Sequence, residues 1–367
     1  MDWCHENCGG IFREPGIPCI LQPASCILHW ESSAGIMKSR ESKKVVLASP
    51  RGFCAGVVRA IDIVNLALEA YGQPIYVRRE IVHNKFVVNE LHQKGIIFVN
   101  ELDEVPAGAR VIFSAHGVSP KVSATARARN LRIIDATCPL VTKVHREAIK
   151  YARRGYTIVL IGHSDHDEVI GTLGEAPKSI TVLDPEGDIE KLQVSHPAKI
   201  AYLTQTTLSL NDTHDIVEKL RQEFPLIQMP SSEDICYATQ NRQSAVLELA
   251  RRQGAGLILV VGSANSSNSC RLVEVAQGAG VPAYLIDDIE DIQLPWLNGV
   301  RIIGLTAGAS APEGLVERVV NYLNGLGYPN VETAGEIVED VEFSLPPELA
   351  HVGWNPQLQA KSGRKSR

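Results

Sequence analysis

Short apolar runs followed by helical segments recur along this chain. Residues 45–48 form one such run, and a glycine-rich turn separates it from helical periodicity over residues 55–68. Comparable runs at 157–161 and 257–261 also end in polar loops before the next helical segment. Strands that alternate with helices of about 10–15 residues are typical of parallel sheets. The pattern therefore predicts an α/β fold.

Three cysteines occupy matching places in this pattern, because each precedes a predicted helix. Cys54 lies in the glycine-rich turn, whereas Cys138 and Cys236 stand just ahead of helical segments at 141–153 and 239–252. Two kinds of polar loop recur in the same order between them. Because open α/β sheets bind ligands beyond the carboxyl ends of their strands, we interpret the chain as three related α/β domains with a shared central site on a pseudo-threefold axis. The alternative is the regular strand–helix spacing of any α/β chain.

The recurring polar loops supply side chains suited to an anion. Hydroxyls, an amide, imidazoles and helix N-termini are the groups that bind phosphate in proteins. Taken singly, each residue is explained equally well as a turn residue, a helix cap or a structural histidine. Their recurrence favours one shared anion site. The candidates are His83, His116, His166, Thr206, Thr207, Ser266, Ser267, Asn268 and Ser310.

The matched cysteines predict a soft-metal site. Thiolates are suited to zinc or to iron–sulfur clusters, and three thiolates on a four-iron cluster leave one iron open to substrate. A structural zinc site normally has four protein ligands, and only three cysteines converge here. The remaining alternative is that each cysteine is a small buried hydrophobic residue, which is our interpretation of Cys270 because the other repeats have no counterpart to it.

Glu168 is the candidate general acid. It follows His166 by two residues, in a loop that the pattern directs toward the same crevice. A carboxyl group beside an anionic ligand has a raised pKa and is able to deliver a proton near neutrality. The alternative is an ordinary surface glutamate.

Composition and charge narrow the functional class. The 367 residues are 44% hydrophobic and 21% charged, as in an ordinary globular protein, and the net charge of −6 argues against a nucleic-acid partner. No apolar run is long enough to span a bilayer, and no secretory or transit segment is evident at the start. Eight cysteines in a chain of this length exclude a secreted disulfide scaffold. We therefore expect a cytoplasmic protein with no membrane partner.

The pattern also predicts where the domains begin and end. Residues 1–42 lack periodicity and are expected to be a disordered extension, with Met37 as an alternative start. The last part of the chain is expected to return as a strand over 331–343 and to end in a disordered basic tail. The predicted segments are 1–42 (extension), 43–136 (first domain), 137–234 (second domain), 235–330 (third domain) and 331–367 (return segment and tail).

Seven motifs in order resemble one known family, the LytB-type 4-hydroxy-3-methylbut-2-enyl diphosphate reductases of the non-mevalonate isoprenoid pathway. The resemblance extends over residues 43–341. The motifs are PRGFCAG at 50–56, EIVHNK at 80–85, SAHGVS at 114–119, DATCP at 135–139, TQTTLS at 204–209, SSNS at 266–269 and TAGAS at 306–310.

The resemblance implies a pseudo-threefold trefoil of three α/β domains around a central iron–sulfur cluster, and it implies roles for the candidate residues. Cys54, Cys138 and Cys236 fall on the ligands of a [4Fe–4S] cluster, while Thr206 and Glu168 match the residues that hold the substrate hydroxyl and deliver protons. The implied reaction uses two electrons and two protons to form isopentenyl and dimethylallyl diphosphates, with ferredoxin or flavodoxin as the electron donor. The implied diphosphate-binding residues are His83, His116, His166, Ser266, Ser267, Asn268 and Ser310.

Four positions depart from the family pattern. Arg79 stands where histidine is expected, Asp167 where proline usually follows the histidine, and Ile170 where an acidic residue is usual. Cys270 replaces a usual serine. An alternative on the same scaffold is a non-catalytic iron–sulfur sensor or regulatory paralogue, which the presence of the predicted acid and hydroxyl residues argues against.

Overall fold

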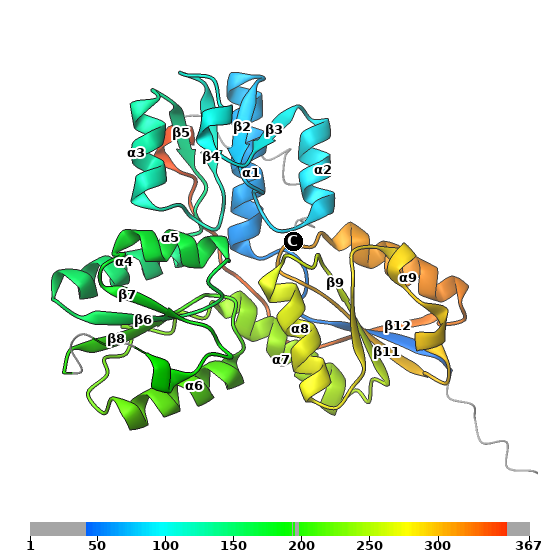
Figure 1. Cartoon of the computed structure of the whole chain (residues 1–367). Helices are drawn as coiled ribbons and strands as arrows, with labels where there is room; N and C mark the ends of the chain where they lie inside the picture. Colours follow the sequence, from blue (N-terminus) through cyan, green and yellow to red (C-terminus); the bar gives the residue numbers. More distant parts are fainter. Residues whose placement is uncertain (1–41, 193, 195–197, 351–367) are drawn as a thin grey trace, which may run out of the picture. The chain divides into compact units, whose positions relative to one another are not determined.

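The structure of the chain is a computed structural model that describes residues 42–192, 194 and 198–350 (Figure 1). The predicted extension, apart from Ser42, and the predicted basic tail lie outside the described residues. The described residues belong to one compact unit. Within the described part of the chain, no helix combines the length and the apolar character needed to cross a membrane.

The largest sheet has five parallel strands with helices on both faces. Alternate residues along its strands are buried on opposite faces: Val45 packs in the core beneath α9, and Val46 in the core beneath α7 and α8. The strand order is β10 (Ala283–Ile286), β9 (Leu257–Val261), β11 (Ile302–Ala307), β1 (Lys44–Ala48) and β12 (Asn330–Ala334). The helices are α7 (Tyr237–Arg251), α8 (Ser267–Gly278) and α9 (Glu313–Gly325).

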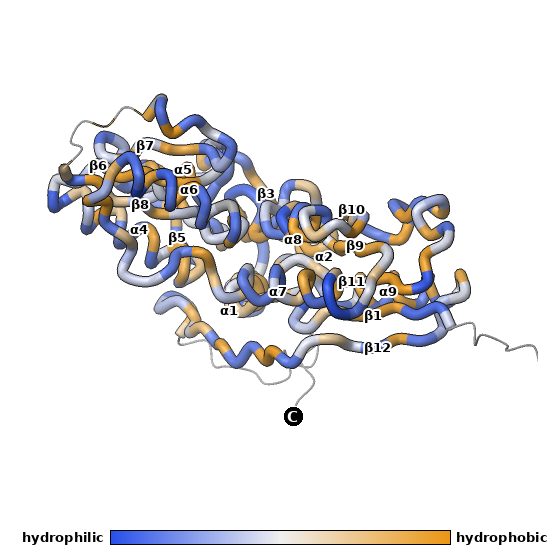
Figure 2. Tube along the Cα trace, turned by 90° about the horizontal axis from the view of Figure 1, so that it is seen from below, coloured by the Kyte–Doolittle hydropathy of each residue, from blue (hydrophilic) through white to orange (hydrophobic). Residues whose placement is uncertain are grey.

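Two smaller parallel sheets follow the same principle. The four-stranded sheet has the order β3 (Ile96–Val99), β2 (Ile75–Arg78), β4 (Arg110–Phe113) and β5 (Arg132–Asp135), with helices α1 (Ala55–Tyr71), α2 (Lys85–Gln93) and α3 (Pro120–Ala128). The three-stranded sheet has the order β7 (Ile180–Leu183), β6 (Thr157–Ile161) and β8 (Ile200–Thr204), with helices α4 (Pro139–Arg153), α5 (Asp167–Glu175) and α6 (Leu210–Glu223). Figure 2 shows the hydrophobic residues concentrated along strands such as β6, β9 and β11.

The predicted α/β fold with parallel sheets is confirmed, but one strand belongs to a different sheet from the one expected. We assigned residues 45–48 to the first repeat, whereas β1 pairs with β11 and β12 in the five-stranded sheet. The chain therefore leaves that sheet at Cys54, and α1 packs in the core of the four-stranded sheet. The reason is non-local pairing, because β11 and β12 hold β1 from both sides and lie more than 250 residues later in the chain. The predicted return strand exists, but only over Asn330–Ala334.

Arg242 of α7 fastens the turn that carries Cys54. Its side chain is fully buried, and its Nε and Nη2 atoms donate to the carbonyl oxygen of Gly52 at 3.0 and 2.7 Å. The same guanidinium contacts the Glu339 carboxylate at 2.9 and 3.2 Å. Gly52 has a φ of 65°, a left-handed conformation that glycine adopts without steric cost. The buried cation thus ties α7 to the turn before α1 and to the segment after β12.

We expect Arg242→Met to lower the free energy of unfolding by about 3 kcal/mol, because the Gly52 carbonyl loses its side-chain donor and the largely buried Glu339 carboxylate loses its cation, keeping the bond from Asn241. Urea denaturation followed by circular dichroism measures this. Arg252→Met is the matched control at the end of the same helix, since that side chain is 79% exposed and its ion pair contributes less than about 1 kcal/mol. Equal losses in the two variants would contradict the structural role of Arg242.

Candidate active site

Each of the three predicted cysteines caps the N-terminus of a helix. Cys54 precedes α1, Cys138 precedes α4 and Cys236 precedes α7. Their backbone N–H groups donate to a carbonyl oxygen in one of the polar loops that recur in the sequence, with N···O distances of 2.9–3.1 Å. The acceptors are Ala309 for Cys54, Ala115 for Cys138 and Thr206 for Cys236. The repeat in the sequence therefore has a counterpart in the backbone hydrogen bonds.

The three thiols face a common space. A Cβ atom added to Gly56 would lie 2.8 Å from the Cys138 sulfur and 3.8 Å from the Cys54 sulfur, so glycine leaves room for both. Burial and, to a smaller extent, the neighbouring Cys54 and Cys236 thiols together raise the pKa of the Cys138 thiol to about 12. Burial likewise raises the pKa of Cys236 to about 11. Thiols with pKa values this high stay protonated at neutral pH, and they become thiolates only when a cationic group binds to them.

The spacing of these sulfur atoms fits a group larger than one metal ion. Sulfur ligands of a tetrahedral zinc lie about 3.8 Å apart, as follows from a Zn–S bond of about 2.3 Å. Among the described residues, the three cysteines do not form a set whose ligand atoms all lie within 4.8 Å of one another. The buried hydroxyl of Tyr237, next to Cys236, also has no hydrogen-bond partner within the described ranges. The donor set therefore fits an iron–sulfur cluster better than zinc.

Three of the predicted histidines form a compact group. The rings of His83 and His116 stack with centroids 3.9 Å apart, and the ring of His166 meets them edge-on at 5.4 and 5.9 Å. Burial lowers the pKa of His116 well below its usual value and lowers that of His166 to about 4. The Glu168 N–H donates to His166 Nδ1 at 3.2 Å, so Nδ1 carries no proton in the neutral ring. The ring proton is therefore on Nε2, and the Nε2–H takes no part in the bond with Glu168.

The predicted hydroxyl and amide residues lie at the ends of the other sheets and join them to the histidine group. Ser310 Oγ donates to the carbonyl oxygen of His83 at 2.8 Å and lies 3.5 Å from Ser266 Oγ. Asn268 Oδ1 accepts from the Ala309 N–H at 2.8 Å, which orients the loop beside Cys54. Ser266 caps α8, so the N-terminus of that helix is also directed at the group.

Thr207 and Ser267 form a second connection between sheets. Thr207 Oγ1 lies 2.9 Å from Ser267 Oγ, and Gln205 Nε2 donates to the two hydroxyls at 2.8 and 3.2 Å.

Glu80 accepts from Asn265 Nδ2 at 2.7 Å and contacts His83 Nδ1 at 3.3 Å. Sequence reasoning missed both Gln205 and Glu80, although each lies inside a motif that was singled out.

Glu168 and Thr206 lie between the cysteines and the histidines. The Glu168 carboxylate accepts from the Thr206 N–H at 2.8 Å and from its hydroxyl at 3.0 Å. Glu168 is 3% exposed, and burial raises the pKa of its carboxyl to about 7 although both hydrogen bonds oppose the change. The alternative of a surface glutamate is therefore wrong, and the carboxyl group is able to hold a proton near neutral pH.

Two of the four departures from the family pattern contact each other. The Arg79 guanidinium forms an ion pair with the Asp167 carboxylate, which joins the end of β2 to the start of α5. Ligand atoms of His83, His116 and Asp167 all lie within 4.8 Å of one another. The guanidinium beside the carboxylate disfavours a metal cation at that point, so we treat the three side chains as part of the anion site.

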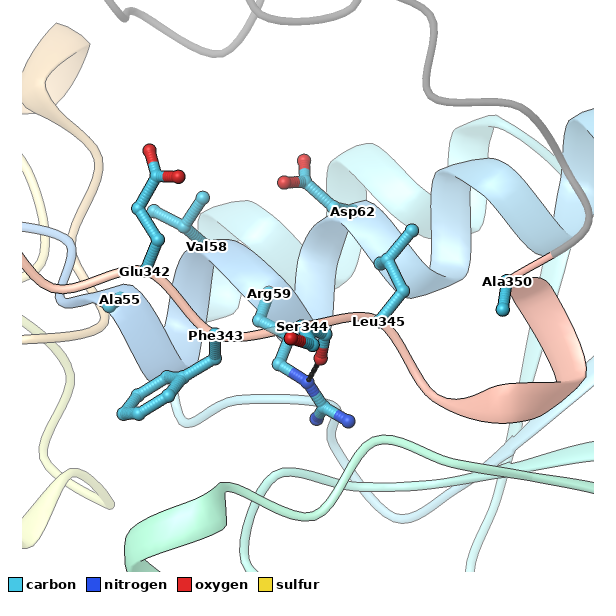
Figure 3. A pocket seen from close by; sticks show the side chains of 9 residues that line it. All are labelled: Ala55, Val58, Arg59, Asp62, Glu342, Phe343, Ser344, Leu345 and Ala350. Carbon is cyan, nitrogen blue, oxygen red and sulfur yellow. Dashed lines mark hydrogen bonds between the residues drawn. The ribbon is translucent and has the colours of Figure 1, made fainter.

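A cavity of about 530 Å³ lies elsewhere, between α1 and the segment after β12 (Figure 3). Arg59 crosses it and donates to the Ser344 carbonyl oxygen at 2.7 Å, while its Nη1 reaches the carbonyl oxygens of Ala136 and Thr137. Neither the histidines nor the hydroxyl residues described above line this cavity. Arg59 therefore holds the turn that precedes Cys138, and the cavity beside it is not the candidate anion site.

Comparison with known proteins agrees with these findings. The profile of the family described as LytB protein matches residues 45–324. A 4-hydroxy-3-methylbut-2-enyl diphosphate reductase from Acidothermus cellulolyticus is 56% identical over 308 residues, which are 84% of this chain and 90% of that protein. One from Leifsonia xyli is 52% identical over 329 residues, 89% of this chain and 97% of that protein.

A solved structure is also similar. The E-1-hydroxy-2-methyl-but-2-enyl-4-diphosphate reductase from Plasmodium falciparum superposes with a TM-score of 0.81 at 41% identity, over 85% of this chain and 98% of that one. Another, titled as the terminal enzyme of the non-mevalonate pathway, gives a TM-score of 0.56 at 30% identity, over 77% and 99% of the two chains. From its matched residues and its fold, the chain belongs to the LytB family.

Proposed function

We propose that this chain reduces 4-hydroxy-3-methylbut-2-enyl diphosphate, the last step of the non-mevalonate route to isoprenoid precursors. Two electrons and two protons remove the allylic hydroxyl as water and leave isopentenyl or dimethylallyl diphosphate. The observation that carries the proposal is the position of Glu168. Its carboxylate is bonded to Thr206, whose carbonyl accepts from the Cys236 N–H, and its own N–H is bonded to His166. The acid thus lies between a thiol site and an anion site.

Cys54, Cys138 and Cys236 are the residues that would hold a [4Fe–4S] cluster. The predicted trefoil around this cluster and the domain limits near residues 136 and 234 are parts of the same proposal. The limit predicted at 330 moves beyond β12, because that strand pairs with β1 in the five-stranded sheet. When bound, the cluster would supply electrons and a Lewis-acidic iron open to substrate. A ferredoxin or flavodoxin is the proposed electron donor.

The diphosphate is assigned to the histidine group and the hydroxyl residues around it. His116 and His166 are neutral at pH 7, because burial lowers their pKa values, and neutral rings still donate one N–H each. The capped N-terminus of α8 adds its dipole and backbone N–H groups. The residues assigned to diphosphate binding are His83, His116, His166, Thr207, Ser266, Ser267, Asn268 and Ser310.

Glu168 is assigned the role of proton donor to the leaving hydroxyl, with the Thr206 hydroxyl as the group that orients or relays the proton. A carboxyl with a pKa of about 7 is protonated in roughly half of the molecules at neutral pH, whereas an ordinary glutamic acid is ionised there. The alternative of a non-catalytic sensor would not require this buried acid, and no feature of the described site favours it.

Iron and acid-labile sulfide test the cysteine assignment. After anaerobic purification and reconstitution, we expect about four of each per chain in the wild type and a loss in Cys54→Ser, Cys138→Ser and Cys236→Ser. Cys270→Ser is the matched control, because that thiol contacts the Ala264 carbonyl and takes no part in the set. An iron content that equals that of the wild type in all three cysteine variants would contradict the assignment.

Substitution of the acid separates catalysis from cluster assembly. We expect Glu168→Gln to lower kcat by at least about 100-fold, because the amide does not deliver a proton, while iron content stays unchanged. Glu218→Gln on α6 is the control, a glutamate in an exposed ion pair with Arg221. Wild-type turnover in Glu168→Gln would rule out the proposed acid.

The pH dependence follows from the same carboxyl group. The protonated form is the active one, so kcat/KM is expected to fall as the pH rises through about 7 and to decrease tenfold per pH unit well above it. Steady-state assays between pH 6 and 9 measure this limb. Binding of inorganic diphosphate over the same range controls for ionisation of the anion. A flat profile with constant binding would show that Glu168 is not the donor.

A further inference from the structure

The ion pair between Arg79 and Asp167 bridges two of the sheets at the edge of the histidine group. Arg79 directly follows β2, and Asp167 is the first residue of α5. The Asp167 side chain is 13% exposed and that of Arg79 is 34% exposed. The arginine lies 4.0 Å from a second carboxylate, that of Glu101, so the pair with Asp167 is its closer ion pair.

The Asp167 carboxylate lies where an anion would meet it. A carboxylate oxygen of Asp167 and a ring nitrogen of both His83 and His116 fall within 4.8 Å of one another. An unpaired carboxylate at this distance would repel a bound diphosphate in the partly dry site. The Arg79 guanidinium cancels that charge and leaves the imidazole N–H groups as the groups that meet the ligand.

The backbone at Arg79 directs its side chain toward α5. Arg79 has a φ of 57°, a left-handed conformation that is uncommon for a residue other than glycine. Its N–H donates to the Val99 carbonyl oxygen at 2.6 Å, which holds the residue at the end of β2. The preceding side chain, Arg78, bonds Glu101 at 3.2 Å instead. Two consecutive arginines therefore have different carboxylates as their nearest partners.

Asp167 begins the helix turn that carries two assigned residues. His166 caps α5, and Glu168 follows Asp167 directly, with its N–H bonded to His166 Nδ1. The start of α5 is also held by the contact between the Glu168 carboxylate and Thr206, so it does not depend on the ion pair alone. The main effect of the ion pair is therefore to neutralise a carboxylate beside the anion site.

We propose that Arg79 is a positioning residue for diphosphate binding, which acts by neutralising the charge of Asp167. The inference rests on the proposed function, since it concerns the same anion site. It predicts that loss of the Arg79 charge weakens diphosphate binding and that loss of the Asp167 charge does not. Loss of Arg79 leaves a bare carboxylate against the diphosphate, whereas loss of the Asp167 charge leaves the arginine as an extra cation near it.

The test compares Arg79→Gln, Asp167→Asn and the double variant, with titration calorimetry of inorganic diphosphate and steady-state kinetics of the reconstituted enzyme. We expect Arg79→Gln to raise the Kd of diphosphate and the KM of substrate about tenfold, with kcat changed less than about threefold. Asp167→Asn should bind at least as tightly as the wild type. The double variant should return to within about threefold of the wild type, because neither charge remains.

Lys85→Gln is the matched control, because Lys85 forms another ion pair between sheets, with Asp287, and its side chain is 64% exposed. It should leave Kd and KM unchanged. Equal tenfold losses in Arg79→Gln and Asp167→Asn, with no recovery in the double variant, would overturn the inference and indicate a structural tie. If Arg79→Gln does not fold, Asp167→Asn alone decides: a tenfold weaker Kd overturns the inference, and unchanged or tighter binding with Arg79→Lys near wild type supports it.

The same experiments distinguish a failure of the reductase proposal from a failure of the proposed role of Arg79. Diphosphate calorimetry does not depend on turnover, so the unequal effects of the two variants are measurable in an enzyme that does not reduce the substrate. Absent turnover in a wild type with a full iron content would refute the reductase proposal and leave the binding result standing. Normal turnover with equal binding losses would refute only the role of Arg79.

Discussion

Three backbone hydrogen bonds hold the candidate site together. The N–H groups of Cys54, Cys138 and Cys236 each donate to the carbonyl of a polar loop that follows a strand, so every cysteine is fixed to the end of a sheet. These bonds use main-chain atoms and leave the thiols free to face a common space. The side-chain contacts then build outward from them: Thr206 supplies one of the three carbonyls and also holds Glu168. The geometry of the acid therefore depends on the same loop as the geometry of a thiol.

At the candidate site, the groups that would contact the ligands are neutral. Burial favours the neutral forms of His116, His166 and Glu168, and it favours the protonated thiols of Cys138 and Cys236. The full charges nearby are paired, as in the contact between Arg79 and Asp167. A site of this kind gains its charge from what it binds, and its own groups supply hydrogen bonds and a proton.

Local patterns were enough to predict the sheets, the cysteine turns and most of the polar loops, because strands, glycine turns and helix caps are encoded over a few neighbouring residues. Pairings between distant residues were not predictable in the same way. The placement of β1 between β11 and β12 depends on partners that both lie more than 250 residues later in the chain, and nothing in residues 44–48 distinguishes one parallel sheet from another. The pair between Arg79 and Asp167 spans 88 positions. In the sequence, Arg79 and Asp167 were recognisable only as two departures from the family pattern. Their ion pair became apparent in the folded structure, where the two side chains are in contact.

The central position of β1 has a consequence for biosynthesis. Cys54 is synthesised more than 250 residues before its backbone partner Ala309, and the strand before it pairs with β11 and β12. The sheet that supports its turn cannot form until those two strands have left the ribosome. Native pairings of such long sequence separation form late, since closing a long loop comes before any gain from its contacts. Assembly of the three-cysteine site therefore waits for β11 and β12, whereas the strands of the sheets that hold Cys138 and Cys236 are synthesised much earlier.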